Sequence, residues 1–351
     1  MNLPMQKHQQ LLLLITLVAI IMVWPKVYSQ ESTATEQARF TIAFGSCNKQ
    51  YKPQPLWEDI MKQDPDLFIW TGDNIYADTA DMQQFKKAYD QQLQNPGYQK
   101  LLQTTPVIGV WDDHDYGKND AGAEWKMKQE SQQLFLDFFA VDEDDERRDR
   151  AGIYTSKIIE KPGGSIKIIL LDTRYFRSPL VRDRQSGKRY QPTTDPSATV
   201  LGATQWQWLA KEIANNYSDF MIIVSSIQYL SGEHEFESWS NFPKERNKMM
   251  ALLEKHKARN VIFLSGDRHI SEFSVYQPDG LSYPLVDFTS SGLTHDYTDF
   301  TGESNRHRVG KVIAIPSFGL LKFDLTTYQV TMEMRGKDNL LLQSYRKTYP
   351  K

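Results

Sequence analysis

The chain has 351 residues, of which 40% are hydrophobic and 24% are charged. These values are ordinary for a globular protein with a full hydrophobic core, and they exclude a low-complexity chain. The formal net charge is −3, so the sequence lacks the basic excess that binds nucleic acid or an anionic membrane surface. A nucleic-acid substrate is therefore not expected. An anionic substrate would have to be held by a local cationic feature, such as bound metal.

The first 29 residues have the organisation of an export signal. Lys7 precedes an apolar run at 11–24, which is shorter than the roughly 20 residues that span a bilayer. Residues 27–29 offer a cleavage site before Gln30. The alternative is an uncleaved N-terminal anchor, which would be the only predicted contact with a membrane. In either case we expect the body of the protein to be exported, to a periplasmic, secreted or luminal location.

After a polar linker at 30–38, we expect one domain at 39–351. Within it, apolar runs typical of strands buried on both faces alternate with segments of helical spacing. The expected strands are 40–44, 67–70, 107–111, 166–171, 220–225 and 261–264. The expected helices are 54–63, 81–102, 123–139, 203–216 and 243–257. This alternation predicts an α/β fold.

The last hundred residues change character. Short segments with alternating apolar and polar residues follow one another, separated by turn sequences. The expected strands here are 272–276, 284–289, 319–325, 328–334 and 339–345. Short turns between such strands favour antiparallel pairing, so we expect an antiparallel C-terminal extension of the main sheets.

Four polar clusters each follow directly on an apolar strand. They are Gly45-Ser46-Cys47-Asn48, Gly72-Asp73-Asn74-Ile75-Tyr76, Asp112-Asp113-His114-Asp115 and Gly266-Asp267-Arg268-His269. In open α/β sheets, ligands bind beyond the carboxyl ends of the strands. If these strands are parallel neighbours, the four clusters converge on one crevice.

That crevice would contain several carboxylates, two imidazoles, a thiol and a phenol. Crowded carboxylates repel one another unless they are protonated or a cation lies among them. Carboxylate oxygens suit hard cations, while imidazole, thiolate and phenolate suit a transition metal such as iron or zinc. Two metals about 3.5–4 Å apart could clamp the attacking and leaving oxygens of a displacement at phosphorus. The pattern therefore favours a metal-dependent hydrolase of phosphate esters.

Each residue also has a structural alternative. Cys47, the single cysteine, could be a small buried hydrophobic side chain, and Tyr76 could be a core residue. Asp73 could serve as a turn residue or helix cap, and His269 could be a hydrogen-bonded loop histidine. One such cluster could arise by chance, but four clusters that each follow a strand are much harder to explain by chance.

Together with Trp111, which precedes the third cluster, these motifs resemble the PhoD-like (alkaline phosphatase D) family of metallophosphoesterases. The match runs in order from about residue 40 to 325, and the segments 171–174 and 290–294 also look like that family. The resemblance implies a two-sheet α/β/β/α sandwich with helices on the outside. It also implies a binuclear or larger metal centre that holds Fe³⁺ and Ca²⁺, with Zn²⁺ as another candidate.

The resemblance also implies ligand sets for this sequence. The residues implied for the iron-like site are Cys47, Asp73, Tyr76 and His269. Those implied for a second, oxygen-rich site are Asp73, Asp113 and Asp267, with Asp73 shared between the two metals. Asp112 could exchange roles with Asp113, and Gln228 is either a weak ligand or none.

In the implied reaction, a metal-bound water or hydroxide attacks phosphorus in line. His114 would stabilise the transition state or protonate the leaving oxygen; alternatively it is a structural histidine held by Asp112 or Asp115. Arg174 and Arg177 could bind the non-bridging oxygens, with surface salt bridging as an equal alternative. The far rim of the pocket would be formed by His295, Asn305, His307 and Arg308.

The expected substrate is a small-molecule or lipid phosphate ester. The motifs do not distinguish a monoester from a diester, and they leave the oligomeric state open. The competing hypothesis is a non-catalytic exported metal-binding domain that retains the fold. Retention of His114 beside every expected type of ligand argues against a decayed site.

Overall fold

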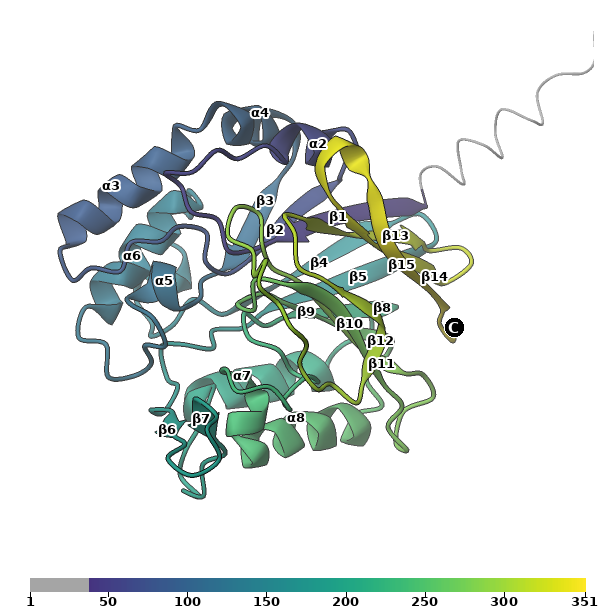
Figure 1. Cartoon of the computed structure of the whole chain (residues 1–351). Coiled ribbons are helices and arrows are strands. Elements are labelled where there is room, and N and C mark those ends of the chain that lie inside the picture. The colour runs from purple at the N-terminus through teal and green to yellow at the C-terminus, as the bar shows by residue number, and fades with distance from the viewer. Residues whose placement is uncertain (1–37) are drawn as a thin grey trace, which may run out of the picture.

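The computed structural model describes residues 38–351 and consists of two β-sheets packed face to face, with helices on the outer faces (Figure 1). The predicted α/β/β/α sandwich is thus confirmed. The expected leader at 1–29 and all of the linker except residue 38 lie outside the described residues. Within 38–351, none of the helices combines the length and the apolar character that a bilayer crossing requires.

The first sheet has six strands and the second has seven. In spatial order the first contains β15 (Leu341–Thr348), β14 (Gln329–Arg335), β13 (Phe318–Asp324), β1 (Arg39–Gly45), β2 (Leu67–Thr71) and β3 (Val107–Val110). The second contains β12 (Arg308–Ile313), β10 (Ser271–Tyr276), β11 (Leu285–Ser290), β9 (Val261–Ser265), β8 (Phe220–Val224), β5 (Gly164–Leu170) and β4 (Thr155–Lys161). A separate small hairpin pairs β6 (Val181–Arg182) with β7 (Tyr190–Gln191).

The helices form the outer layers of the sandwich. Figure 1 shows α2, α3, α4 and α6 on the side of the first sheet and α7 and α8 on the side of the second. Their bounds are α2 (Trp57–Met61), α3 (Met82–Leu93), α4 (Pro96–Thr104), α5 (Asp113–Tyr116), α6 (Lys128–Phe138), α7 (Gly202–Ala214) and α8 (Pro243–Lys255). Because helices cover the outer faces, the central strands are buried on both sides. Every residue of β2, β8 and β9 is buried, which accounts for their unbroken apolar sequences.

Aromatic side chains fill the space between the two sheets. Phe44 of β1 meets Phe288 of β11 edge to face, with ring centroids 4.7 Å apart. Phe220 of β8 meets Phe323 of β13 in the same way at 5.2 Å. Such edge-to-face pairs add a favourable electrostatic contribution to the burial of apolar area. The sandwich core therefore fixes the positions of β1, β8, β11 and β13 relative to one another.

The sequence-based assignments differ from the structure in several places. The expected helix at 81–102 is two helices, because Asn95 caps a new helix whose first residue is Pro96. The C-terminal strands are not uniformly antiparallel, since β11 pairs in parallel with β9. The edge strands β4 and β12 and the β6–β7 hairpin were not predicted; β4 is largely exposed and carries lysine and glutamate, so it lacks the apolar signal of a buried strand.

The four polar clusters come from both sheets. Strands β1, β2 and β3 are parallel neighbours in the first sheet, as expected. The fourth strand, β9, lies in the second sheet, parallel to β8 and β11. The site is therefore built across the sandwich rather than along one sheet.

Candidate metal centre

The residues implied for the first site meet around the carboxylate of Asp73. The Tyr76 hydroxyl lies 3.0 Å from Asp73 Oδ2 and 3.1 Å from His269 Nε2. The Cys47 sulfur lies 3.4 Å from the same Asp73 oxygen. Potential ligand atoms of Cys47, Asp73 and His269 all fall within 4.8 Å of one another. One thiol, one phenol, one imidazole and one carboxylate thus surround a common point.

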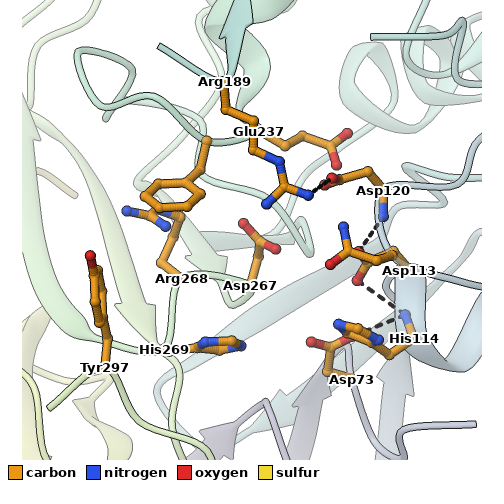
Figure 2. Close-up of a pocket in the computed structure, with 12 residues that line it drawn as sticks. Asp73, Asp113, His114, Asp120, Arg189, Glu237, Asp267, Arg268, His269 and Tyr297 are labelled. Carbon is orange, nitrogen blue, oxygen red and sulfur yellow. Dashed lines mark hydrogen bonds and ion pairs between the residues drawn. The ribbon is translucent and has the colours of Figure 1, made fainter. Parts of the chain in front are cut away.

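Two further groups of potential ligands are linked to the first through Asp73 and then Asp113. One combines Asp73, Asp113 and His114, and the other combines Asp112, Asp113 and Asp267, again with ligand atoms within 4.8 Å of one another. Asp73 therefore belongs to two groups, as a bridging ligand would. Figure 2 shows Asp73, Asp113, Asp267 and His269 around the same space. The geometry has room for more than one cation.

Four of these residues have a left-handed backbone. The φ angles are 58° for Cys47, 52° for Asp73, 66° for Asp267 and 56° for His269. Non-glycine residues adopt this conformation at a cost of roughly 1–2 kcal/mol each, and such strain tends to collect at functional sites. The turns after β1, β2 and β9 are therefore held in conformations that aim these side chains inward.

Asp115 holds the loops after β2 and β3 together. Its carboxylate accepts hydrogen bonds from the backbone N–H groups of Asp73 (3.1 Å), Asn74 (3.1 Å) and Asp112 (2.6 Å). Gly72 lies at the same junction with φ of 98°, and a Cβ there would approach Asp112 Cβ to 2.5 Å. Asp115 is thus a positioning residue, and the glycine permits the close approach of the two loops.

The buried carboxylates oppose ionisation in the absence of a cation. Burial raises the pKa of Asp112 to about 7, although Arg174 acts against this shift. Burial, together with the negative charge of Asp112 and Asp113, also raises the pKa of Asp267 well above its usual range. Burial likewise opposes ionisation of Asp113, but the charges of His114 and Arg174 outweigh it and lower the pKa. Stored repulsion of this kind is relieved when a multivalent cation binds.

The donor set fits such a cation. Oδ2 of Asp112 is buried and accepts no hydrogen bond from residues 38–351, so this member of the group with Asp113 and Asp267 has an unsatisfied carboxylate oxygen. Burial and the neighbouring His295 and Arg268 lower the pKa of His269 to about 3, which keeps this imidazole neutral and able to coordinate. Burial also raises the pKa of the Cys47 thiol to about 11, a shift that coordination reverses because a metal-bound thiol is deprotonated.

His114 is held by a residue that the sequence did not indicate. Its Nδ1 lies 2.7 Å from Asp78 Oδ1, and its ring stacks on Tyr76 with centroids 4.1 Å apart. Neither Asp112 nor Asp115, the partners considered from sequence, holds the ring. Burial disfavours its charge, but Asp113 and Asp73 outweigh burial and raise the pKa of His114 to about 11. The imidazole lines the pocket beside these two carboxylates.

Arg174 and Arg177 lie beneath the site rather than on its wall. Both side chains are completely buried. Arg174 donates to Asp112 (2.6 Å) and Glu237 (2.7 Å), and Arg177 pairs with the other oxygen of Glu237 at 2.9 Å. This placement departs from the expected contact with substrate oxygens, because both guanidinium groups are already paired and shielded. Their position instead fixes the orientation of Asp112.

Gln228 is buried in a different polar network. Its amide donates to Glu272 at 2.9 Å and to Thr289 at 2.8 Å, and no hydrogen bond within residues 38–351 joins it to an expected ligand. The residues expected at the rim of the pocket also divide between this polar network and the candidate metal centre. Asn305 and Arg308 also bind Glu272, whereas His295 stacks on His269 with centroids 3.9 Å apart.

The site opens into a pocket of about 270 Å³. Its lining includes the expected residues Asp73, Asp113, His114, Asp267 and His269. It also includes six residues that the sequence did not indicate: Asn119, Asp120, Arg189, Phe236, Glu237 and Tyr297. These six come from loops and from the β6–β7 hairpin, where no periodic pattern or motif marks a residue as functional.

The sequence and the fold both match known proteins. Residues 42–332 match the family model described as PhoD-like phosphatase. A curated relative, alkaline phosphatase D of Bacillus subtilis (strain 168), is 20% identical, with 66% of this chain and 46% of the relative covered. The chain thus spans about half the length of that relative.

Three solved structures share the fold. A structure of PhoD superposes with a TM-score of 0.70 at 16% identity, covering 88% of this chain and 68% of that one. GAP50, described as the anchor in the inner membrane complex of Plasmodium, gives 0.57 at 11% identity, covering 89% and 90%. A dimetal phosphatase from Danio rerio gives 0.50 at 13% identity, covering 89% and 99%.

The family match extends over most of the chain and includes all four polar clusters. It begins within β1 and ends within β14, so it takes in strands of both sheets. The chain belongs to the PhoD-like phosphatase family.

Proposed function

We propose that this protein is an exported, metal-dependent hydrolase of phosphate esters, acting on phosphomonoesters, phosphodiesters or both. The observation that carries the proposal is the convergence of potential metal ligands, from the ends of four strands in two sheets, on one site. Among them, Asp73, Asp113, Asp267 and His269 line its pocket. Family membership and the alkaline phosphatase D relative support the same reaction class.

The residues divide the chemical work between them. When bound, the cations would acidify a water molecule and neutralise charge on the phosphate. His114, protonated and oriented by Asp78 through Nδ1, has Nε2 left to donate a proton to the leaving oxygen. Arg174 and Glu237 hold Asp112 in place from below. Asp113 is fixed from the other side, because the backbone N–H of Asp120 donates to its Oδ2 at 2.6 Å.

The ligand types suggest which metals the site takes. The thiol, phenol and imidazole around Asp73 suit a transition metal, for which we propose Fe³⁺, with Zn²⁺ as the alternative. The carboxylates of Asp112, Asp113 and Asp267 suit a hard cation such as Ca²⁺. Elemental analysis of the protein as isolated tests both assignments.

Cys47 offers a spectroscopic test of the first assignment. A thiolate–Fe³⁺ or phenolate–Fe³⁺ site should colour the protein, and Cys47→Ala should lose both the colour and the iron. Ser46→Ala is the comparison variant, because it removes the hydroxyl that donates to Cys47 Sγ at 3.6 Å but leaves the thiol in place. If the Cys47→Ala protein kept its full iron content, Cys47 would not be a ligand, and the alternative that it is a small buried hydrophobic residue would hold.

Hydrolysis is tested with p-nitrophenyl phosphate and bis(p-nitrophenyl) phosphate, with Ca²⁺ and either Fe³⁺ or Zn²⁺ added. Asp73→Asn should reduce turnover by more than about 100-fold, since even residues that only support a ligand change metal affinity or activity by about 10- to 100-fold. Asp90→Asn, on the exposed face of α3, should have no effect. Absence of metal-dependent turnover on both esters would refute the proposal.

The export proposal rests on the leader-like residues 1–29, and a substrate outside the cytoplasm follows from it. Small-molecule and lipid phosphate esters are the proposed substrate classes, whereas the net charge of −3 argues against nucleic acid. Membrane contact would come only from an uncleaved N-terminal segment. N-terminal sequencing of the protein from its native host would show whether residues 1–29 are removed.

A second candidate function is a non-catalytic metal-binding domain. GAP50, described as an anchor in the inner membrane complex of Plasmodium, shares this fold, so the fold also occurs in a protein with an anchoring role. This candidate predicts metal binding without turnover. The ester assay and elemental analysis together separate it from the hydrolase.

A further inference from the structure

Two arginines line the pocket among residues 38–351, and they differ in how they are engaged. Arg268 donates through Nη2 to both oxygens of Glu303, at 2.7 and 2.6 Å. Its guanidinium also lies 4.2 Å from the ring centroid of Phe236, and only 4% of its side chain is exposed. Arg268 is therefore held by Glu303 and Phe236 and is almost completely buried, although its Nε has no hydrogen-bond partner within residues 38–351.

Arg189 is held more loosely, and its guanidinium lies 5.4 Å from the ring centroid of Tyr190. Its Nη2 donates to Asp120, and within the described chain no other hydrogen bond uses its guanidinium. The side chain is 32% exposed. Figure 2 shows the guanidinium reaching into the space bordered by Asp120, Asp113 and Asp267. Its Nε and Nη1 therefore remain able to donate to a ligand in the pocket.

The hairpin that carries Arg189 is anchored to both sides of the pocket. The hydroxyl of Tyr190 donates to Asp120, and its backbone N–H donates to the carbonyl of Glu235 at 3.1 Å. Tyr190 is only 5% exposed. Asp120 in turn donates its backbone N–H to Asp113. Arg189 is thus held at a defined position relative to an expected metal ligand.

We propose that Arg189 binds the non-bridging oxygens of the phosphate group in this pocket, the role that sequence analysis considered for Arg174. The proposal rests on the proposed function, because it deepens the account of how the ester is held. A planar guanidinium presents parallel N–H groups that match two phosphate oxygens. Bound cations would neutralise the carboxylates of Asp73, Asp113 and Asp267. The phosphate would then lie between the cations and the guanidinium of Arg189.

Inorganic phosphate is the probe, and isothermal titration calorimetry of the metal-loaded protein is the measurement. Arg189→Ala should weaken phosphate binding by about 10- to 100-fold, the range expected for charge-assisted hydrogen bonds. Arg189→Lys should retain part of the affinity, because lysine keeps the charge but not the paired donors. Metal content, measured in parallel, should equal that of the unmodified protein in both variants.

Arg182 provides a matched control on the same hairpin. It pairs across the hairpin with Tyr190, is exposed, and does not line the pocket. Arg182→Ala removes the same charge and should leave phosphate affinity within about twofold of the original. If Arg182→Ala weakened binding as much as Arg189→Ala, the effect would be general electrostatics and the proposal would fail.

Two other results would overturn the proposal. One is an Arg189→Ala protein with full metal content and unchanged phosphate affinity. In that case Arg189 would have only a structural role, linking the hairpin to Asp120. The other is absence of measurable phosphate binding by the unmodified metal-loaded protein. If Arg189→Ala does not fold, Arg189→Lys carries the same test. Since the assay needs no turnover, phosphate binding through Arg189 without ester hydrolysis would refute only the proposed function.

Discussion

Replacement of Arg174 by methionine tests whether this residue supports the site from below or contacts substrate. Arg174 and Arg177 are paired with the carboxylates of Asp112 and Glu237, and all four side chains are buried. The two positive charges balance the two negative charges. Arg174→Met retains much of the volume but leaves one carboxylate charge uncompensated in a site without solvent.

The expected loss of stability is about 3–5 kcal/mol, the range measured when one partner of a buried ion pair is removed. Such a loss lowers the folding equilibrium constant by roughly two to three and a half powers of ten. Exposed substitutions away from special features change stability by about 0.5 kcal/mol or less. Arg182→Met, on the exposed hairpin, is therefore the matched comparison.

The assay is urea unfolding of the metal-loaded proteins, followed by fluorescence of the eight tryptophans. Linear extrapolation gives the free energy of unfolding, and an unchanged slope shows that the denatured state is comparable. A loss below about 1 kcal/mol, together with a collapse of ester hydrolysis or phosphate affinity, would contradict the supporting role. It would restore the expectation that Arg174 touches the substrate.

Two further predictions concern the loops and the carboxylates. Gly72→Ala should lower the free energy of unfolding by about 2–4 kcal/mol and impair metal binding. The new Cβ would be strained by the left-handed backbone and would also overlap with Asp112. Gly187→Ala is the control, because Gly187 has φ of 79° and no atom of residues 38–351 lies within 4 Å of the new Cβ. It should show the cost of backbone strain alone. If urea unfolding gave both variants the same loss of unfolding free energy, the argument from close approach would be refuted. Metal-free protein should lose stability as the pH rises from about 4 to about 7, because folded Asp112 has a pKa of about 7 against 3.8 for the ordinary group. Saturating metal should suppress this decline in unfolding experiments across the same pH range, and an identical decline with and without metal would contradict the assignment.

Much of the site could be predicted from sequence because its residues occur in short motifs at strand ends. Cys47, Asp73, Asp113 and His269 each follow an apolar run within a few residues, and all four meet in the structure. The local rule that ligands bind beyond the carboxyl ends of strands was sufficient to group them. The prediction assumed that the four strands are parallel neighbours, which holds for β1, β2 and β3. It does not hold for β9, which belongs to the second sheet and brings its cluster to the site across the sandwich.

The supporting residues could not be predicted in the same way. Asp78, which orients His114, and Glu237, which joins Arg174 to Arg177, lie in segments without periodicity. Arg189 reaches the pocket from a two-stranded hairpin far along the chain. Nothing in the local sequence distinguishes such residues from ordinary surface charges, because their importance comes from long-range contacts.

The sequence by itself determined where the buried strands lie along the chain, the α/β class and the chemical types of the candidate ligands, because these depend on local apolar patterns and short motifs. Only the tertiary structure decided which charged groups face the pocket and which are buried beneath it. Arg174 and Arg189 carry the same side chain, yet one is completely buried between two carboxylates and the other reaches into the pocket. That difference arises from packing between segments distant in sequence, which sets the exposure and the partners of each charge.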